Sequence, residues 1–179
     1  MKVTELELSG VFLIEPRIFH DDRGYFFESL RMDVLRSVVP QVDFVQFNES
    51  KSKSGVIRGL HLQAPPFAQA KLVRAVRGYI LDVVVDVRRN SPTYGRWMSV
   101  ELNDDNKRSL YIPEGFAHGF ASLADDTVVQ YGCTAYYNKA SEMGIRFDDP
   151  HLAIAWPSNG TVSEKDLQLP YFSDFNSPF

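Results

Sequence analysis

Cysteine is nearly absent from this sequence of 179 residues, and long apolar runs are missing altogether. Because Cys133 is the only cysteine, the chain cannot form an internal disulfide, and a reducing cytoplasm is the expected compartment. No segment approaches the roughly 18 consecutive apolar residues of a membrane span, and the first residues lack the apolar core of a signal peptide. The sequence therefore predicts a cytoplasmic protein that does not cross a membrane.

An excess of positive charge is also missing. The 19 Lys and Arg residues against 23 Asp and Glu give a formal net charge of −4, which argues against bulk binding to nucleic acid or an anionic membrane. A small anionic ligand is still compatible with this charge, because such a ligand responds to local cations. The content of 44% hydrophobic and 23% charged residues is typical of globular proteins, and we expect residues 1–179 to form a single domain.

Helical periodicity is poor along most of the chain. We expect a short helix over Asp33–Val39 and helical turns over Asp148–Ile154 and Ser163–Leu167, the last with Ser163 as its N-cap. Runs rich in Val, Ile, Phe and Tyr, separated by Gly, Pro, Asn and Asp, predict an all-β sandwich or barrel with small helices at its edges. The expected strands are Gly24–Leu30, Phe44–Ser50, Val56–Leu62, Lys71–Val76, Tyr79–Val87, Trp97–Leu102 and Thr127–Tyr137.

The run Tyr79–Val87 places two carboxylates in an apolar strand. Period-two alternation puts Asp82 and Asp86 on one face, and the opposite face, which must be buried, consists of Leu81, Val83, Val85 and Val87. Two interpretations are open for the acidic face. It either faces solvent, or it points into a polar barrel interior, where the carboxylates would need cationic partners.

The chain has only four histidines, and they fall into two kinds of segment. His20 and His151 lie beside Asp-rich turns, so we expect both at the surface. His61 and His118 lie in apolar, strand-like segments. Taken alone, each of these is compatible with a satisfied core histidine or with a functional one.

Two spacings around these histidines resemble the sequence motifs of the cupin barrel. They are Gly55 followed by His61 six residues later, and Pro113-x-Gly115 followed by His118. Metal-binding cupins have a second histidine and a glutamate in the first motif, whereas this chain has Gln63. A catalytic metal normally has at least three protein ligands, so the pattern predicts a cupin-like jelly-roll barrel without a metal.

A pocket without a metal needs other acid–base groups. Histidine has an unperturbed pKa of about 6.5, which makes His61 a suitable base near neutral pH. A tyrosine is a candidate proton donor: Tyr131 and Tyr137 would project from one face of the strand Thr127–Tyr137. Both tyrosines are equally compatible with a role as core aromatics.

A longer set of segments resembles the dTDP-4-dehydrorhamnose 3,5-epimerase family, the RmlC-like epimerases. The resemblance covers nearly the whole chain, and the combined order and spacing of the segments are highly specific. The segments are Asp22–Glu28, Phe44–Ser50, Arg58–Gln63, Ala70–Arg74, Leu81–Arg88, Ser91–Gly95, Ile112–Phe120, Tyr136-Tyr137 and Ser163–Asp166.

The resemblance implies an epimerase acting on a dTDP-linked 4-keto-6-deoxyhexose, without a cofactor. In such enzymes a histidine removes a proton beside the ketone, an enolate forms, and a tyrosine reprotonates the carbon from the opposite face. By resemblance, His61 is the base, Tyr131 the acid, Asp166 the carboxylate that orients His61, and Lys71 the group that stabilises the enolate oxygen, with Asp82 holding Lys71. Asp82 is then expected to point inward.

The family pattern also implies a set of ligand contacts and a homodimer. Tyr137 is expected to stack on the thymine ring, and the segment Arg23–Glu28 to complete the pocket of the neighbouring subunit. Arg58 and His61 are three residues apart and can share a pocket only if the strand bends or bulges at Gly59. The implied substrate contacts are Arg23, Glu28, Gln46, Asn48, Arg58, Lys71, His118, Tyr137, Glu142 and Lys165.

Three other functions are compatible with the same pattern. A 3-epimerase for a related deoxysugar would use almost the same residues. Gly132 stands beside the proposed acid, at a position where many relatives carry a larger residue. This difference bears on whether C5 is inverted. A metal-dependent cupin enzyme and a non-catalytic sugar-nucleotide binding module are the alternatives from other classes.

Overall fold

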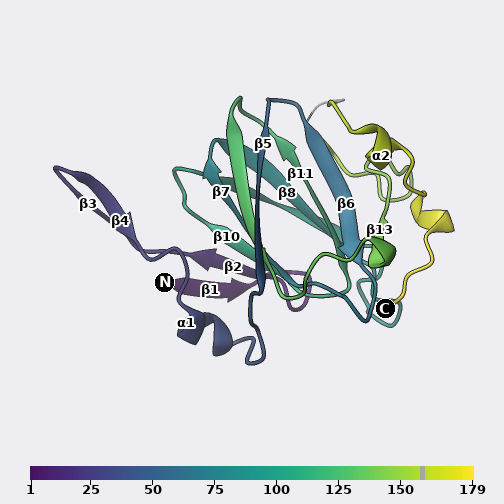
Figure 1. The fold of residues 1–179 in the computed structure, drawn as a ribbon, viewed down its shortest axis with the longest axis horizontal. Helices are drawn as coiled ribbons and strands as arrows, with labels where there is room; N and C mark the ends of the chain where they lie inside the picture. Colours follow the sequence, from purple (N-terminus) through teal and green to yellow (C-terminus); the bar gives the residue numbers. More distant parts are fainter. Residues whose placement is uncertain (158–159) are drawn as a thin grey trace.

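Two antiparallel β-sheets pack face to face in the computed structural model, which describes residues 1–157 and 160–179 (Figure 1). The six-stranded sheet has the order β1 (Lys2–Glu5), β2 (Phe12–Glu15), β10 (Ser109–Ile112), β7 (Lys71–Arg77), β12 (Thr127–Cys133) and β5 (Gln46–Ser52). The five-stranded sheet has the order β13 (Glu142–Gly144), β6 (Ile57–Gln63), β11 (Phe116–Ser122), β8 (Tyr79–Asp86) and β9 (Trp97–Asn103). This is the expected all-β, jelly-roll architecture.

The helices are short and peripheral. They are α1 (Met32–Arg36), α2 (Glu164–Leu167) and the 3₁₀ turns η1 (Lys139–Ser141) and η2 (Phe172–Asp174). Ser163 caps α2 as expected, because its hydroxyl accepts the N–H of Asp166. The expected turn over Asp148–Ile154 is present as a hydrogen-bonded turn, in which the Ala153 N–H donates to the carbonyl oxygen of Asp149, but it does not extend into a helix. No helix of the described residues is long and apolar enough to cross a membrane.

The main core lies between the two sheets, where inward side chains of both interdigitate. It includes Val73 and Val129 from one sheet and Ile80, Val84 and Phe120 from the other. A second cluster covers the outer face of the five-stranded sheet, where Val83, Val85 and Val87 pack against C-terminal residues that include Leu152, Ile154 and Phe172. The strand β8 is therefore buried on both faces, which explains its nearly continuous apolar sequence.

The alternation of β8 decides the position of its two carboxylates. Asp82 and Asp86 are both fully buried, so the solvent-facing interpretation is wrong and the inward interpretation of Asp82 is confirmed. Asp86 is held near the strand end by Arg88 and by the hydroxyls of Ser91 and Thr93. These bonds lower the pKa of Asp86 overall, although burial, the largest single effect, raises it.

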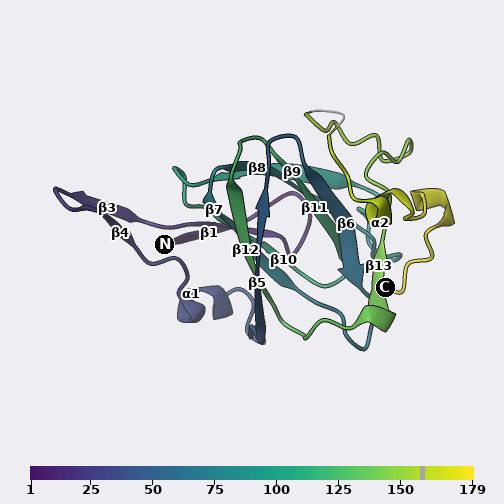
Figure 2. The ribbon, with the colours of Figure 1, turned by 45° about the horizontal axis from the view of Figure 1, so that its top comes forward.

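The hairpin of β3 (Ile18–Asp21) and β4 (Gly24–Phe27) projects away from the sandwich (Figures 1 and 2). It carries three exposed aromatic side chains, Phe19, Tyr25 and Phe26. Arg23 lies at its tip, 90% exposed, and pairs with Asp21. A hairpin that extends so many apolar side chains from a sandwich is a candidate contact surface for another chain.

Strand β6 bends at Gly59, as the spacing of Arg58 and His61 predicted. His61 pairs with His118 and Arg58 pairs with Phe120, so β6 advances three residues while β11 advances two. Gly59 has a φ of +117° and lies against Gly119, where a Cβ on Gly59 would be 2.5 Å from the Gly119 Cα. The bulge therefore depends on two glycines that face each other across the strands.

We expect Gly119→Ala to destabilise the protein by about 1–3 kcal/mol, the usual cost of overpacking. A Cβ at Gly119 would lie 2.6 Å from the carbonyl oxygen of Arg58, and this backbone oxygen cannot move without shifting β6. Urea unfolding measures the free energy, with Ser99→Ala, an exposed change in the same sheet, as the control. Equal stability of Gly119→Ala and the parent would show that β6 has room to move.

Candidate active site

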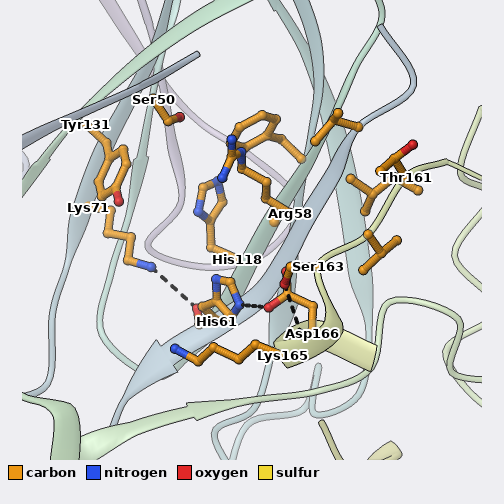
Figure 3. A pocket seen from close by; sticks show the side chains of 15 residues that line it. Ser50, Arg58, His61, Lys71, His118, Tyr131, Thr161, Ser163, Lys165 and Asp166 are labelled. Carbon is orange, nitrogen blue, oxygen red and sulfur yellow. Dashed lines mark hydrogen bonds and ion pairs between the residues drawn. The ribbon is translucent and has the colours of Figure 1, made fainter. Parts of the chain in front are cut away.

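A cavity of about 450 Å³ opens between the two sheets (Figure 3). It collects side chains from β5, β6, β7, β11 and β12 and from the segment that carries α2. A smaller cavity of about 130 Å³ adjoins it and shares His61, Lys71 and Tyr131. The polar side chains that line the larger cavity are Ser50, Arg58, His61, Lys71, His118, Tyr131, Thr161, Ser163, Lys165 and Asp166.

His61 and Asp166 form a short hydrogen bond on one wall of the cavity. His61 Nε2 lies 2.6 Å from Asp166 Oδ1, and Figure 3 shows the two side chains facing each other. When the neutral ring donates from Nε2, its lone pair is on Nδ1, which is the tautomer that a base requires. The Asp166 side chain is only 5% exposed, whereas that of His61 is 33% exposed, so the imidazole is accessible and its partner is not.

The first turn of α2 holds the Asp166 carboxylate in place. Its second oxygen accepts the backbone N–H of Gly59 at 3.3 Å, which the bend in β6 leaves available. Burial, the largest effect, raises the pKa of Asp166, but the hydrogen bonds from His61, Gly59 and Ser163 outweigh it and the pKa is lowered. Asp166 is therefore a carboxylate near neutral pH and can accept the hydrogen bond of His61.

Lys71 enters the cavity from the six-stranded sheet. Its Nζ donates to the carbonyl oxygen of His61 at 3.4 Å. Burial lowers the pKa of Lys71, and the nearby Cys133, Asp82 and Glu142 oppose this effect. The ammonium group thus lies beside His61 in a desolvated position, where its attraction for a developing negative charge is strong.

In the described residues Asp82 forms no hydrogen bond or ion pair with Lys71, although its charge opposes the lowering of the Lys71 pKa by burial and so favours the ammonium form. Asp82 instead accepts a hydrogen bond from His118 Nε2 at 2.9 Å, and both side chains are buried. Asp82 and His118 lie on neighbouring strands of one sheet, close to the pairs Phe120–Asp82 and His118–Val84. Lys71 projects from the facing sheet, and its Nζ reaches across to the carbonyl oxygen of His61 on β6.

Tyr131 stands on the opposite wall from His61. It projects inward from β12 in the six-stranded sheet, and His61 belongs to the five-stranded sheet. Burial raises the pKa of Tyr131, so its hydroxyl keeps its proton near neutral pH. Gly132 beside it is covered by Phe44 and Phe47, which occupy the place of a larger side chain.

Tyr137 does not share a strand face with Tyr131, because β12 ends at Cys133. The chain then turns, and Tyr137 lies half-exposed at the rim of the smaller cavity. Its hydroxyl donates to Glu142 at 2.9 Å and its backbone N–H donates to Gln46 at 2.9 Å. The length predicted for this strand was too great because an apolar run continues past the last paired residue.

The remaining predicted ligand contacts divide into two groups. Gln46, Asn48, Tyr137 and Glu142 line the smaller cavity, and Lys165 lines the larger one and forms an ion pair with Glu142 at 2.5 Å. Arg23 and Glu28 are not among the lining residues of either cavity in this chain. Sequence analysis missed Ser50, Thr161 and Ser163, since a serine or threonine in a strand or turn carries no distinctive pattern.

Within residues 1–157 and 160–179, the His, Cys, Asp and Glu side chains form no group of three or more that could hold a metal ion. His20 is exposed on its hairpin, and His151 is exposed and stacks on Phe172, as expected for surface histidines. The two functional candidates, His61 and His118, are each paired with a carboxylate.

We expect the stability difference between the parent and Asp166→Asn to shrink in acid. The pKa of Asp166 is depressed in the folded state, so its contribution is complete above the unfolded pKa of about 3.9 and is lost as the pH falls through the lower folded pKa. Urea unfolding at a series of pH values from neutral to 3 measures this difference. A difference independent of pH would contradict the depressed pKa.

Comparison with known proteins identifies the family. The family model described as dTDP-4-dehydrorhamnose 3,5-epimerase matches residues 5–174. The dTDP-4-dehydrorhamnose 3,5-epimerase of Shigella flexneri is 47% identical, and the match covers 97% of each chain. The crystal structure of the enzyme of that name from Elizabethkingia anophelis has a TM-score of 0.93 at 43% identity, with 97% of each chain covered.

A further solved structure is that of the 3,5-epimerase from Legionella pneumophila in complex with dTDP-4-keto-L-rhamnose. It has a TM-score of 0.93 at 39% identity and covers 98% of this chain and 94% of its own. Sequence and fold agree over almost the full length in each comparison. The chain therefore belongs to the dTDP-4-dehydrorhamnose 3,5-epimerase family.

Proposed function

We propose that this protein epimerises dTDP-4-dehydro-6-deoxy-D-glucose at C3 and C5 to dTDP-4-dehydro-L-rhamnose, a step in dTDP-L-rhamnose biosynthesis, without a metal. One observation carries the proposal. A carboxylate-paired histidine and a partly buried tyrosine stand on opposite walls of one cavity, with a lysine ammonium beside the histidine. The family relationship supplies the substrate, a dTDP-linked 4-keto sugar.

Proton removal is the role that we assign to His61. The 4-keto group acidifies the C–H bonds at C3 and C5, and His61 takes the proton while the electron pair of the broken bond moves onto the ketone oxygen. The Asp166 carboxylate stabilises the resulting imidazolium, as the 2.6 Å contact allows. A positioned base contributes about 10²–10⁴-fold to the rate.

The enolate oxygen is the charge that Lys71 is placed to stabilise. The ammonium group is already in the cavity before the substrate binds, and burial leaves it little competing solvent. Preorganised charge of this kind contributes as much as the acid–base groups or more, because no reorganisation is needed as the negative charge develops.

Inversion requires that the proton return from the other face of the sugar. Tyr131 projects from the wall opposite His61, and its raised pKa keeps the hydroxyl protonated. Proton removal by His61 and delivery by Tyr131 at the same carbon change the configuration. The same pair serves both carbons if the sugar ring presents each in turn.

The remaining residues are proposed to hold the nucleotide. Arg58 and Lys165 are the cations that face the diphosphate, and Gln46, Asn48 and Glu142 are polar partners in the smaller cavity. Tyr137 stacks on the thymine ring at its rim. His118, oriented by Asp82, contacts the sugar from the floor of the cavity.

We also propose that the enzyme is a cytoplasmic homodimer. Arg23 and Glu28, two ligand contacts of the family pattern, lie on or beside a hairpin that extends away from its own cavity (Figure 1). A second copy gives both the exposed aromatics of the hairpin and these two residues a partner, because a two-fold interface places each hairpin at the other subunit. The buried, reduced Cys133 is compatible with the cytoplasm.

Turnover of the 4-keto sugar in D₂O tests the reaction. We expect deuterium at both C3 and C5 of the product, because each inversion replaces a carbon-bound hydrogen with one from solvent. Proton NMR of the product measures the label at each carbon. Label at C3 alone would identify a 3-epimerase, and binding of the substrate without any exchange would identify a non-catalytic module.

The same experiment with variants assigns the two roles. His61→Ala is expected to lower exchange at both carbons by at least about 10²-fold, because a positioned base contributes at least that factor to the rate. Tyr131→Phe keeps the base, so we expect exchange to continue with retained configuration while net inversion falls. Near-parent turnover of His61→Ala would overturn the mechanism.

Complementation between two impaired variants tests the shared site. Arg23→Ala removes a hairpin contact and His61→Ala removes the base, and each variant alone should be impaired. If the hairpin completes the pocket of the other subunit, a mixed dimer contains one site with both native residues, so subunit exchange should restore part of the activity. If native mass spectrometry shows that mixed dimers have formed and the activity of the mixture is still unchanged, the arrangement is contradicted.

A further inference from the structure

Strand β5 holds Arg58 along one edge of its guanidinium group. Nε donates to the Ser52 hydroxyl at 3.1 Å, and Nη2 donates to the carbonyl oxygen of Lys51 at 3.1 Å. Both acceptors are neutral. In the part of the chain that the structure describes, no carboxylate forms an ion pair with Arg58. The guanidinium is thus oriented while its charge is left uncompensated.

Other arginines of this protein also use the guanidinium edge formed by Nε and Nη2, but they direct it at a carboxylate. Arg23, Arg31 and Arg88 each direct Nε and Nη2 at one aspartate, which both orients and compensates the guanidinium. At Arg58 a hydroxyl and a backbone carbonyl take the place of that aspartate. The edge formed by Nη1 and Nη2 is then the one available to an anion, and Arg58 lines the larger cavity.

Ser52 is well placed for this task. It is buried, and its backbone pairs with Thr127 at the end of β5, so the position of its hydroxyl is set by the sheet. Arg58 lies just before the bulge at Gly59, and its guanidinium group contacts β5. A long, flexible side chain is thereby tied at its end to a rigid strand, which reduces the conformational freedom lost when a ligand binds.

We propose that Ser52 is a positioning residue, which fixes the guanidinium of Arg58 so that its outer edge faces the diphosphate of the substrate. The inference rests on the proposed function. Ser52 acts through Arg58 and not on the reacting carbons. Its loss should therefore weaken nucleotide binding and leave the chemical step unchanged.

Binding of dTDP to Ser52→Ala, measured by calorimetry, tests this role. One net hydrogen bond corresponds to about a two- to tenfold change in affinity, so we expect the Kd for dTDP and the KM to rise by about that factor with kcat unchanged. Ser52→Thr keeps the hydroxyl and should restore the parent Kd. Ser54→Ala, an exposed change two residues further along the chain, is the matched control.

A double-mutant cycle separates positioning from a general structural effect. In an Arg58→Ala background, Ser52→Ala should cause no further loss of dTDP affinity, because the group that it positions is gone. Additive losses, an unchanged Kd in Ser52→Ala, or a fall in kcat at constant KM would each overturn the proposal. A parent protein that does not bind dTDP would overturn the proposed function itself and this inference with it.

Discussion

A regular strand cannot present both Arg58 and His61 to one pocket, because side chains three residues apart point to opposite faces. The bend at Gly59 removes this conflict, and it also turns the Gly59 N–H toward Asp166. The bend in turn requires the close approach of Gly119 on β11. The proposed base, its carboxylate partner and the cation proposed for the diphosphate therefore all depend on one contact between two glycines.

The cavity floor concentrates charge where water is scarce. Asp82, His118 and Asp166 are buried, Lys71 is partly buried, and one oxygen of Asp82 has no hydrogen-bond partner in the described residues. Burying such groups opposes folding unless they are paired. The apolar core between the sheets offsets this cost, and the same desolvation strengthens the electrostatic interactions that the proposed mechanism uses.

Sequence reasoning predicted most of the architecture from local patterns. The alternation of β8 indicated its two faces, and Ser163 was identified as the cap of α2. Sequence reasoning failed where strand pairing, and not the local conformational preference of the residues, determines the structure. The central strand β11 contains Ala117, His118 and Gly119, which favour no strand by themselves, and only its position between β6 and β8 explains it. For the same reason the predicted end of β12 was too late, and Tyr137 was placed on the wrong face.

The candidate site shows the same division between what local sequence patterns predict and what strand pairing determines. His61, Tyr131, Lys71 and Asp166 could be named from the sequence, because motif spacing and family resemblance specify residue types at given positions. The sequence did not show which of these side chains contact one another. Asp82 bonds to His118 on the adjacent strand β11, and Lys71 reaches the carbonyl oxygen of His61 from the facing sheet. Ser52 meets Arg58 because β5 and β6 border the same cavity. Residue identity is a local property, whereas the hydrogen-bond partner of a side chain depends on strand register and sheet packing, which only the tertiary structure determines.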